Sequence, residues 1–277
     1  MVGNDFRNAL REGKHVYGTQ ISSTSPKMFD SVISLGLDFV FFCNEHIQYN
    51  PETLSWMCNA FKAAGVNPLV RILEPSPFLA TQALDAGACT ILVPYVEELD
   101  DVIALIGAVK YRPLKGEKLM RILHGEEKPS EELKQYLIKN NRNHSLVLNI
   151  ESQKGVKMMN EFIKIQTLDG PGVDGLMIGP HDLSTSYGMP EKYFSKEFLD
   201  LSCGIIQNAR SKGVAVGGHT GYRDSLDLQM QWAKAGATML LHCSDAFLSA
   251  NQLNNDLNQI KKLLGTAEHI NKSSESI

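Results

Sequence analysis

The sequence predicts a single-domain α/β protein whose eight parallel strands close into a (β/α)8 barrel, on three observations. Eight short runs are continuously apolar, as in parallel strands that are buried on both faces. Segments with helical spacing separate these runs. A glycine recurs where such a segment ends and the next run begins, as in LGLDFVFF, DAGACTILVP and AGATMLLHC. Glycine accepts the left-handed conformation that turns a chain from a helix back to the sheet.

The predicted strands alternate with helices along the chain. The strands span residues 16–21, 38–43, 68–72, 90–96, 145–150, 175–179, 214–218 and 238–243. Ser25 and Pro26 predict a capped helix start before 27–35, and Asn50 and Pro51 predict one for a helix that ends near residue 64. Further helices are predicted over 77–86 and 223–235. The alternative is an open doubly wound sheet, which usually carries a glycine-rich fingerprint after its first strand; the letters GTQI at that place form none.

One segment departs from this alternation. Residues 111–143 are charged and polar, and they lie between the fourth and fifth predicted strands. We predict an insertion in a barrel domain of residues 1–265, with a short helix near 130–138 that Ser130 caps. An insertion of this length is usually a lid, a binding loop or a disordered stretch, and we expect it to line the far end of the substrate pocket. Residues 266–277 are predicted to form a disordered tail.

Bulk composition excludes several classes of function. The net charge of −4 and the pI near 6.1 provide no basic surface for nucleic acid. The apolar runs are far shorter than the roughly 20 residues of a membrane span. The first residues are charged and read as no secretory signal, and the five cysteines are scattered without a CxxC pair. We therefore expect a cytoplasmic protein that binds neither nucleic acid nor membrane.

Barrel enzymes place their reactive side chains at the carboxyl ends of the strands. Glu151 follows the fifth predicted strand and Asp182 follows the sixth, so both carboxylates can share one hard cation. Mg²⁺, Mn²⁺ or Co²⁺ would suit such oxygen ligands, with water and substrate completing the coordination. The alternatives are that Asp182 only caps the next helix and that Glu151 is a solvated strand-end acid.

Three further groups stand at the same ends of strands. Gly179, Pro180 and His181 precede a helix, where main-chain N–H groups could hold a substrate carboxylate, or they form a plain turn. Arg71 could bind the oxygen of a 2-oxo group and stabilise an enolate, or it could form a surface salt bridge. His46 could carry protons near neutral pH, although a single histidine is more often structural.

The chain resembles the HpcH/HpaI aldolase family from about Gly18 to Leu248. The likeness is carried by GLDFV…EH at 36–46, VR at 70–71, LDAG…VP at 84–94, IE at 150–151 and, most specifically, VDGLMIGPHDLS…G at 173–188. The resemblance implies a divalent-metal-dependent pyruvate aldolase on a (β/α)8 barrel of the phosphoenolpyruvate/pyruvate-domain type. It also implies a homo-oligomer, either a hexamer or a trimer of dimers.

The resemblance assigns roles to the residues at the strand ends. It implies that Glu151 and Asp182 bind the metal directly, and that Arg71 stabilises the pyruvate enolate. It further implies that His46 handles protons and that the loop 179–182 holds the pyruvate carboxylate.

Three more positions match the family's supporting residues. Asp85 matches an aspartate that reaches the active site of the neighbouring subunit, and Glu45 matches a glutamate that acts through metal-bound water. Asn149 stands where the family has a glutamine, two residues before the metal-binding glutamate, and we expect it to contact the substrate.

These residues predict a carbon–carbon lyase that cleaves or forms 4-hydroxy-2-oxo acids, with a 2-oxo acid and an aldehyde as its partners. The family's Asp-Gly-Glu-His reads CNEH at 43–46, so the aspartate that orients the histidine is a cysteine, and Lys118 replaces an arginine after the fourth strand. These departures leave two alternatives open. One is related enolate chemistry, such as oxaloacetate decarboxylation or a specialised biosynthetic carbon–carbon step. The other is a metabolite-binding protein without catalytic activity.

Overall fold

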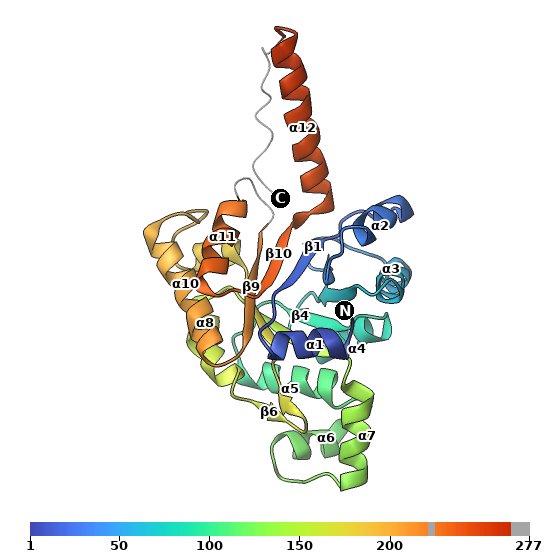
Figure 1. Cartoon of the computed structure of the whole chain (residues 1–277). Helices are drawn as coiled ribbons and strands as arrows, with labels where there is room; N and C mark the ends of the chain where they lie inside the picture. Colours follow the sequence, from blue (N-terminus) through green and yellow to red (C-terminus); the bar gives the residue numbers. More distant parts are fainter. Residues whose placement is uncertain (221–224, 267–277) are drawn as a thin grey trace.

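The computed structural model describes residues 1–220 and 225–266, and the chain folds as a closed barrel of eight parallel strands (Figure 1). The barrel strands are β1 (Val16–Gln20), β2 (Phe39–Cys43), β3 (Asn67–Arg71), β4 (Thr90–Val93), β5 (Ser145–Ile150), β8 (Gly175–Ile178), β9 (Ala215–Thr220) and β10 (Met239–Ser244). They follow one another around the barrel in chain order, and β10 pairs with β1 to close it. The predicted fold class is confirmed. The largest difference at a strand end is in β4, which stops at Val93 instead of residue 96.

Helices surround the strands. They are α2 (Pro26–Ile33), α3 (Pro51–Ala63), α4 (Pro77–Asp85), α5 (Leu99–Lys110), α8 (Gln153–Phe162), α10 (Lys196–Ser211) and α11 (Ser225–Ala235). The side chains of Ser25 and Asn50 cap α2 and α3 as expected, because each accepts a main-chain N–H of the first turn. Alternate strand residues point inward and outward, so the apolar core has two parts, one inside the barrel and one between strands and helices.

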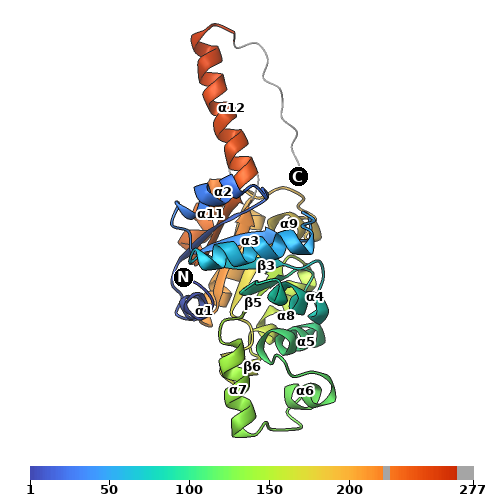
Figure 2. The same cartoon turned by 90° about the vertical axis from the view of Figure 1, so that its right-hand side faces the viewer.

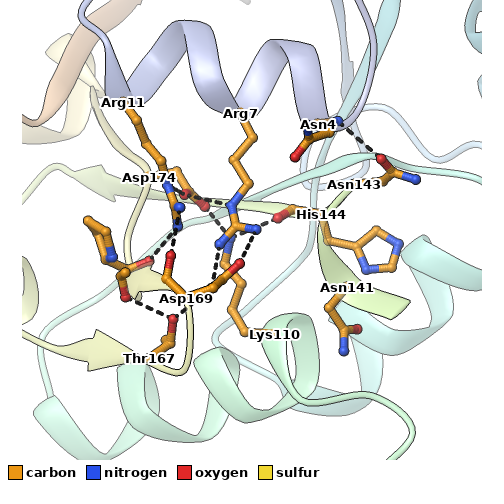
Figure 3. Close-up of polar contacts among 12 residues, drawn as sticks. Asn4, Arg7, Arg11, Lys110, Asn141, Asn143, His144, Thr167, Asp169 and Asp174 are labelled. Atoms are coloured by element: carbon orange, nitrogen blue, oxygen red, sulfur yellow. Dashed lines mark hydrogen bonds and ion pairs between the residues drawn. The ribbon is translucent and has the colours of Figure 1, made fainter. Parts of the chain in front are cut away.

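A helix that the sequence analysis did not anticipate, α1 (Asn4–Arg11), closes the amino-terminal end of the barrel. Figure 3 shows its two arginines reaching the buried Asp174. Oδ1 of Asp174 accepts from Nε of Arg7 at 3.2 Å and from Nε of Arg11 at 3.0 Å, and Oδ2 accepts from Lys110. Burial alone would raise the pKa of Asp174, but these three cations outweigh it and hold the pKa below its ordinary value. A small hairpin of β6 (Gln166–Thr167) and β7 (Gly170–Pro171) completes this end, where Asp169 binds Arg7 through both carboxylate oxygens.

The segment between α5 and β5 forms two helices, α6 (Gly116–Leu123) and α7 (Glu131–Asn141). The side chain of Ser130 caps α7, as predicted, by accepting from the main-chain N–H of Leu133 at 3.2 Å. Because the segment leaves from the end of α5 and enters the start of β5, it lies at the amino-terminal end of the barrel. Figures 1 and 2 show it opposite to α12. The expectation that this segment lines the far end of the pocket is therefore wrong for its own barrel.

The last described helix, α12 (Asp245–Leu263), projects away from the barrel in both views (Figures 1 and 2). Residues 267–277, for which disorder was predicted, lie outside the described residues. Within 1–220 and 225–266, no helix combines the length and apolarity that crossing a membrane requires.

Candidate active site

The carboxyl ends of the parallel strands meet at one mouth of the barrel, and the predicted site residues gather there. Cys43 at the end of β2 pairs with Arg71 at the end of β3, and the end of β5 pairs with the end of β8. Glu151 directly follows β5, and Gly179 directly follows β8 and precedes α9 (Pro180–Ser186). The structure brings together Glu45, His46, Arg71, Asn149, Glu151, Gly179 and Asp182.

Arg71 is held on three sides. Its Nε lies 2.9 Å from Oε2 of Glu45, and its Nη2 donates to Sγ of Cys43 at 2.9 Å. Its guanidinium also lies 5.6 Å from the centre of the Phe41 ring. Only 2% of the residue is exposed, so Arg71 forms a buried contact set and not a surface salt bridge. A guanidinium fixed in this way can present its remaining N–H groups to a substrate oxygen without reorganisation.

The imidazole of His46 is more than half exposed at the rim of the mouth. Its Nε2 lies 3.9 Å from Oε2 of Glu45, which makes Glu45 the acid that faces the ring. Cys43 occupies the position at which the family has the aspartate that orients the histidine. In the structure its sulfur accepts the main-chain N–H of His46 at 3.3 Å. Cys43 therefore supports the loop that carries His46.

Glu151 is a buried carboxyl with two hydrogen-bond donors. Oε1 accepts the main-chain N–H of Tyr95 at 2.6 Å, and Oε2 accepts the side-chain amide of Asn149. Burial raises the pKa of Glu151 to about 7; the Tyr95 N–H opposes this, while the nearby charges of Asp182 and Glu45 add to it. A bound cation would ionise a carboxyl group whose pKa is raised in this way, because metal ligands must be deprotonated.

The short helix α9 presents Asp182 in its first turn. Gly179 is its N-cap residue and supplies no side-chain cap. The acidic charge of Asp182 suits the amino-terminal end of the helix, and it lies near enough to Glu151 to raise that residue's pKa. His181 follows Pro180 but points elsewhere, since its Nδ1 lies 3.2 Å from the hydroxyl of Tyr193.

The oxygen ligands at this mouth fit a hard cation whose remaining coordination positions stay open to water or substrate. Oδ1 of Asn149 is buried and lacks a hydrogen-bond partner among the described residues. Across residues 1–220 and 225–266, no group of three or more histidine, cysteine, aspartate or glutamate side chains converges as a metal site. A cation here would therefore be held by the carboxylates of Glu151 and Asp182 and would need oxygens from water or substrate, which is the coordination that Mg²⁺ prefers.

The imidazole of His219, near the end of β9, lines the mouth as an uncharged group. Burial lowers its pKa to about 3, and the charges of Arg71 and His46 contribute to the shift. Its ring centre lies 6.2 Å from that of Phe41. An imidazole that stays neutral does not compete with Arg71 for an anionic substrate.

Asp85, another predicted residue, lies away from this mouth. It ends α4 at the amino-terminal end of the barrel, where its exposed side chain pairs with Arg112. A role at the site of a neighbouring subunit stays a prediction.

Sequence reasoning missed Tyr95, which contacts Glu151 at the mouth. Its main-chain N–H donates to Oε1 of Glu151 at 2.6 Å, and the nearby charges of Glu45, Glu151 and Asp182 help to raise the pKa of its phenol. The only signal in the sequence is its place directly after Pro94, where the fourth strand ends.

Comparisons with known proteins show similarity of sequence and of fold. The 2-keto-3-deoxy-L-rhamnonate aldolase of Salmonella gallinarum is 27% identical over 217 residues, which cover 78% of this chain and 79% of that protein. An HpcH/HpaI aldolase from Desulfitobacterium hafniense has the same fold with a TM-score of 0.75 and 24% identity, over 92% of this chain and 96% of that one. A phosphonopyruvate hydrolase solved with oxalate and Mg²⁺ shares the fold more distantly, with a TM-score of 0.57 and 12% identity over 100% and 93% of the two chains.

The sequence model of one family, described as HpcH/HpaI aldolase/citrate lyase, matches residues 17–251. This match spans every barrel strand except the first residue of β1, and it includes all the residues gathered at the mouth. The chain therefore belongs to the HpcH/HpaI aldolase/citrate lyase family and is an enzyme of the class II aldolase and lyase type.

Proposed function

We propose that the protein cleaves or forms 4-hydroxy-2-oxo acids through a pyruvate-type enolate, with a divalent cation held by Glu151 and Asp182. The observation that carries the proposal is the buried carboxyl of Glu151, whose pKa is raised to about 7 beside a second acid. A buried acid that is repelled by a neighbouring carboxylate favours a cation between the two. Arg71, fixed across the same mouth, supplies a matching positive charge for the substrate.

The chain's own residues account for the remaining steps in the cleavage direction. A bound cation would supply Lewis-acid polarisation of the 2-oxo group. Main-chain N–H groups of the loop 179–182 bind the carboxylate, and Arg71 donates to the 2-oxo oxygen as negative charge develops there. His46 takes the proton of the C4 hydroxyl, the C3–C4 bond breaks, and its electron pair passes into the 2-oxo group. The aldehyde leaves, and a proton returned to C3 gives the 2-oxo acid.

Two relatives support this assignment. The rhamnonate aldolase acts on a 2-keto-3-deoxy acid, which belongs to the proposed substrate class. Oxalate, bound with Mg²⁺ in the phosphonopyruvate hydrolase, offers the adjacent oxygens that a pyruvate enolate would present. Mg²⁺, Mn²⁺ and Co²⁺ are the cations we propose, because each accepts carboxylate oxygens and retains exchangeable positions.

The test is release of pyruvate from a panel of 4-hydroxy-2-oxo acids after chelation and re-addition of Mg²⁺, Mn²⁺ or Co²⁺. We expect turnover only with added metal, and we expect Glu151→Gln and Asp182→Asn to abolish both turnover and metal binding by calorimetry. Asp200→Asn, an exposed acid on α10, is the control that should change neither. Metal binding that survives replacement of both acids would refute the proposal.

A second candidate, decarboxylation of oxaloacetate, is favoured by one observation. Cys43 contacts Arg71 and the main chain of His46, but no acid stands behind the imidazole at that position. Decarboxylation reaches the same enolate by loss of CO₂ and needs no base for a C4 hydroxyl. Under this candidate Cys43→Asp leaves the native reaction no faster. A strong gain of aldol cleavage in Cys43→Asp would exclude a site retuned for decarboxylation.

We further propose that the protein assembles through α12. In the other barrel strands outward side chains are buried under helices, but Tyr17 of β1 is 51% exposed, and the outward Leu240 and His242 of β10 are partly exposed. The helix α11 contacts β10, but α12 leaves the barrel and does not cover β1 (Figure 2). The neighbouring α11 also exposes Leu226 and Met230.

The projecting helix has its own uncovered apolar stripe. Leu253, Leu257, Ile260 and Leu264 are exposed and spaced by four, three and four residues, which places them on one face. The exposed apolar face of α12 and the exposed outward side chains of β1 and β10 complement each other. A second copy of this chain, with its α12 laid over β1 and β10, would bury both. We also propose a cytoplasmic location, since all five cysteines are free thiols.

A further inference from the structure

His219 carries an imidazole that the proposed cleavage steps do not use. Successive residues of its strand, β9, point alternately into and out of the barrel. Ala215, four residues earlier on the same face, belongs to the core inside the barrel. His219 also pairs with Leu241 of β10, which is another member of that inner core. The imidazole therefore points inward, at the mouth where the reactive side chains gather.

The neighbours of His219 belong to the candidate active site. The strands β8 and β9 pair in parallel, and their register places His219 beside Gly179, where β8 ends. The ring centre of Phe41 lies 6.2 Å from that of His219, and the guanidinium of Arg71 lies 5.6 Å from the centre of the same phenyl ring. Arg71 and His219 thus lie against one aromatic ring and face the same space.

One ring nitrogen of His219 lacks a partner. Its Nε2 is buried from solvent and has no hydrogen-bond partner among the described residues. Burial, with a contribution from the charges of Arg71 and His46, lowers the pKa of the ring to about 3, so the ring carries a single hydrogen and no charge. A buried polar atom without a partner costs stability, and most buried polar atoms in proteins have one. A bound substrate can supply the missing partner.

The proposed cleavage leaves one substrate oxygen without a residue that stabilises it. The loop 179–182 binds the carboxylate, Arg71 donates to the 2-oxo oxygen, and His46 takes the proton of the C4 hydroxyl. The oxygen that loses this proton becomes the carbonyl oxygen of the aldehyde when the C3–C4 bond breaks. Negative charge develops on it during cleavage, and in synthesis it must be polarised before the enolate attacks. A neutral imidazole can polarise a carbonyl by donating a hydrogen bond while it keeps its own hydrogen.

We infer that His219 is a further catalytic residue, whose Nε2–H donates a hydrogen bond to the C4 oxygen of the substrate. His46 takes the proton from this oxygen in cleavage and returns it in synthesis. His219 gives up no proton in either direction, and it stabilises the oxygen while that oxygen is unprotonated. The inference rests on the proposed lyase function.

Two assays on the Mg²⁺-loaded enzyme separate the halves of the reaction. Exchange of the C3 hydrogens of pyruvate in D₂O, followed by NMR, reports enolate formation without an aldehyde, and cleavage of 4-hydroxy-2-oxo acids adds the step at C4. We expect His219→Leu to lower kcat for cleavage by about 100-fold, as for loss of a donor to a developing oxyanion, and to change the exchange rate by less than about twofold. His219→Gln keeps a side-chain N–H and should stay within about tenfold of the wild type in cleavage.

Two further variants serve as references for these assays. Arg71→Lys should impair exchange as well as cleavage, because Arg71 acts on the 2-oxo oxygen. His124→Leu replaces an exposed histidine at the end of α6 and should change neither rate. Since His219→Leu removes a polar atom without a partner, its Tm should equal or exceed that of the wild type.

The outcomes distinguish this inference from the proposed function. If the wild type cleaves no acid of the panel, the proposed function fails and the role of His219 falls with it. If the wild type cleaves and His219→Leu cleaves equally fast, only the inference is overturned. Equal losses of exchange and cleavage in His219→Leu would also overturn it, since His219 would then serve the enolate or the fold and not the C4 oxygen.

Discussion

A Cβ atom added to Gly179 would lie 2.7 Å from Oε2 of Glu151, closer than real contacts allow. The end of β8 therefore requires glycine so that the carboxylate of the neighbouring strand can occupy its position. Gly179→Ala should displace Glu151 and weaken Mn²⁺ binding by about tenfold or more in calorimetry. Gly204→Ala is the matched control, because nothing lies within 4 Å of its new methyl group. In the middle of α10 it should leave metal binding intact and stabilise the protein by about 0.5–1 kcal/mol. Equal metal affinity in both variants would contradict this account of Glu151.

Metal binding should depend steeply on pH around neutrality. Because burial raises the pKa of Glu151 to about 7 in the metal-free protein, a cation must displace a proton below that pH. We expect the affinity for Mg²⁺ or Mn²⁺ to fall by up to about tenfold per pH unit below 7 and to level off above it. Calorimetry in buffers of different ionisation enthalpy should register close to one released proton at pH 6. Affinity that is flat between pH 5.5 and 7.5 would show that Glu151 is not the titrating ligand.

The same group predicts the opposite trend in the stability of the metal-free protein. Its folded pKa of about 7 lies above the ordinary value of 4.5, so the folded state binds the proton more tightly than the unfolded state. The free energy of unfolding contributed by Glu151 therefore increases as the pH falls from about 8 to 5, by about 3 kcal/mol at most. Urea unfolding of wild type and Glu151→Gln across this range isolates the contribution. A difference between them that does not change with pH would refute it.

Arg71 should not tolerate lysine. The guanidinium contacts Glu45 through Nε and Cys43 through Nη2, and an ammonium group cannot make both contacts and still reach a substrate oxygen. We expect Arg71→Lys to lower kcat by about 100-fold, as for loss of a donor to a developing oxyanion. Arg121→Lys, on α6 at the opposite end of the barrel, is the control and should retain full activity. Retention of kcat in Arg71→Lys would mean that a point charge suffices at this place.

The barrel itself could be predicted because its strands are buried on both faces. Runs such as that of β2, in which all five residues are buried, read as strands without any alternation. Glycines at the helix ends and capping residues such as Ser25 and Asn50 then fixed where the helices lie. The acids at strand ends followed from topology, since parallel strands bring their carboxyl ends to one mouth.

What could not be predicted depends on contacts between distant segments. The main-chain N–H of Tyr95 binds Glu151, which lies 56 residues later, and the left-handed backbone of Tyr95 is not specified by the letters VPYVEE. The segment 111–143 was assigned to the wrong end because α5 was not recognised. A helix after β4 returns the chain to the amino-terminal end before that segment begins. The plug formed by α1 was missed because its arginines bind Asp174, more than 160 residues away.

The ion pairs between α1 and Asp174 at the amino-terminal end of the barrel should affect stability and not activity. Asp174 is fully buried against Arg7, Arg11 and Lys110, so Asp174→Asn leaves the buried Lys110 without its acidic partner and leaves Arg7 with Asp169 alone. We expect a loss of about 3–5 kcal/mol in the free energy of unfolding by urea. The folded variant should keep its kcat, since the plug and the active site lie at opposite ends of the barrel. The double variant Asp174→Leu with Lys110→Met should lose less than the sum of its two single changes. Additive losses would show that the Asp174–Lys110 pair is not coupled.

The arm formed by α12 predicts how assembly can be disrupted. Leu257→Lys, combined with Leu253→Lys, places charge on the apolar stripe and should lower the number of subunits measured by light scattering. Asn255→Lys adds the same charge on the opposite face of the helix and should leave assembly unchanged. On the receiving surface, Tyr17→Lys should have the same effect as the stripe variants, because the uncovered strands bind the partner's helix. If assembly buries these surfaces, the wild-type Tm rises with protein concentration and that of the stripe variant does not. Full assembly of both the stripe and the Tyr17 variants would show that α12 does not join the subunits.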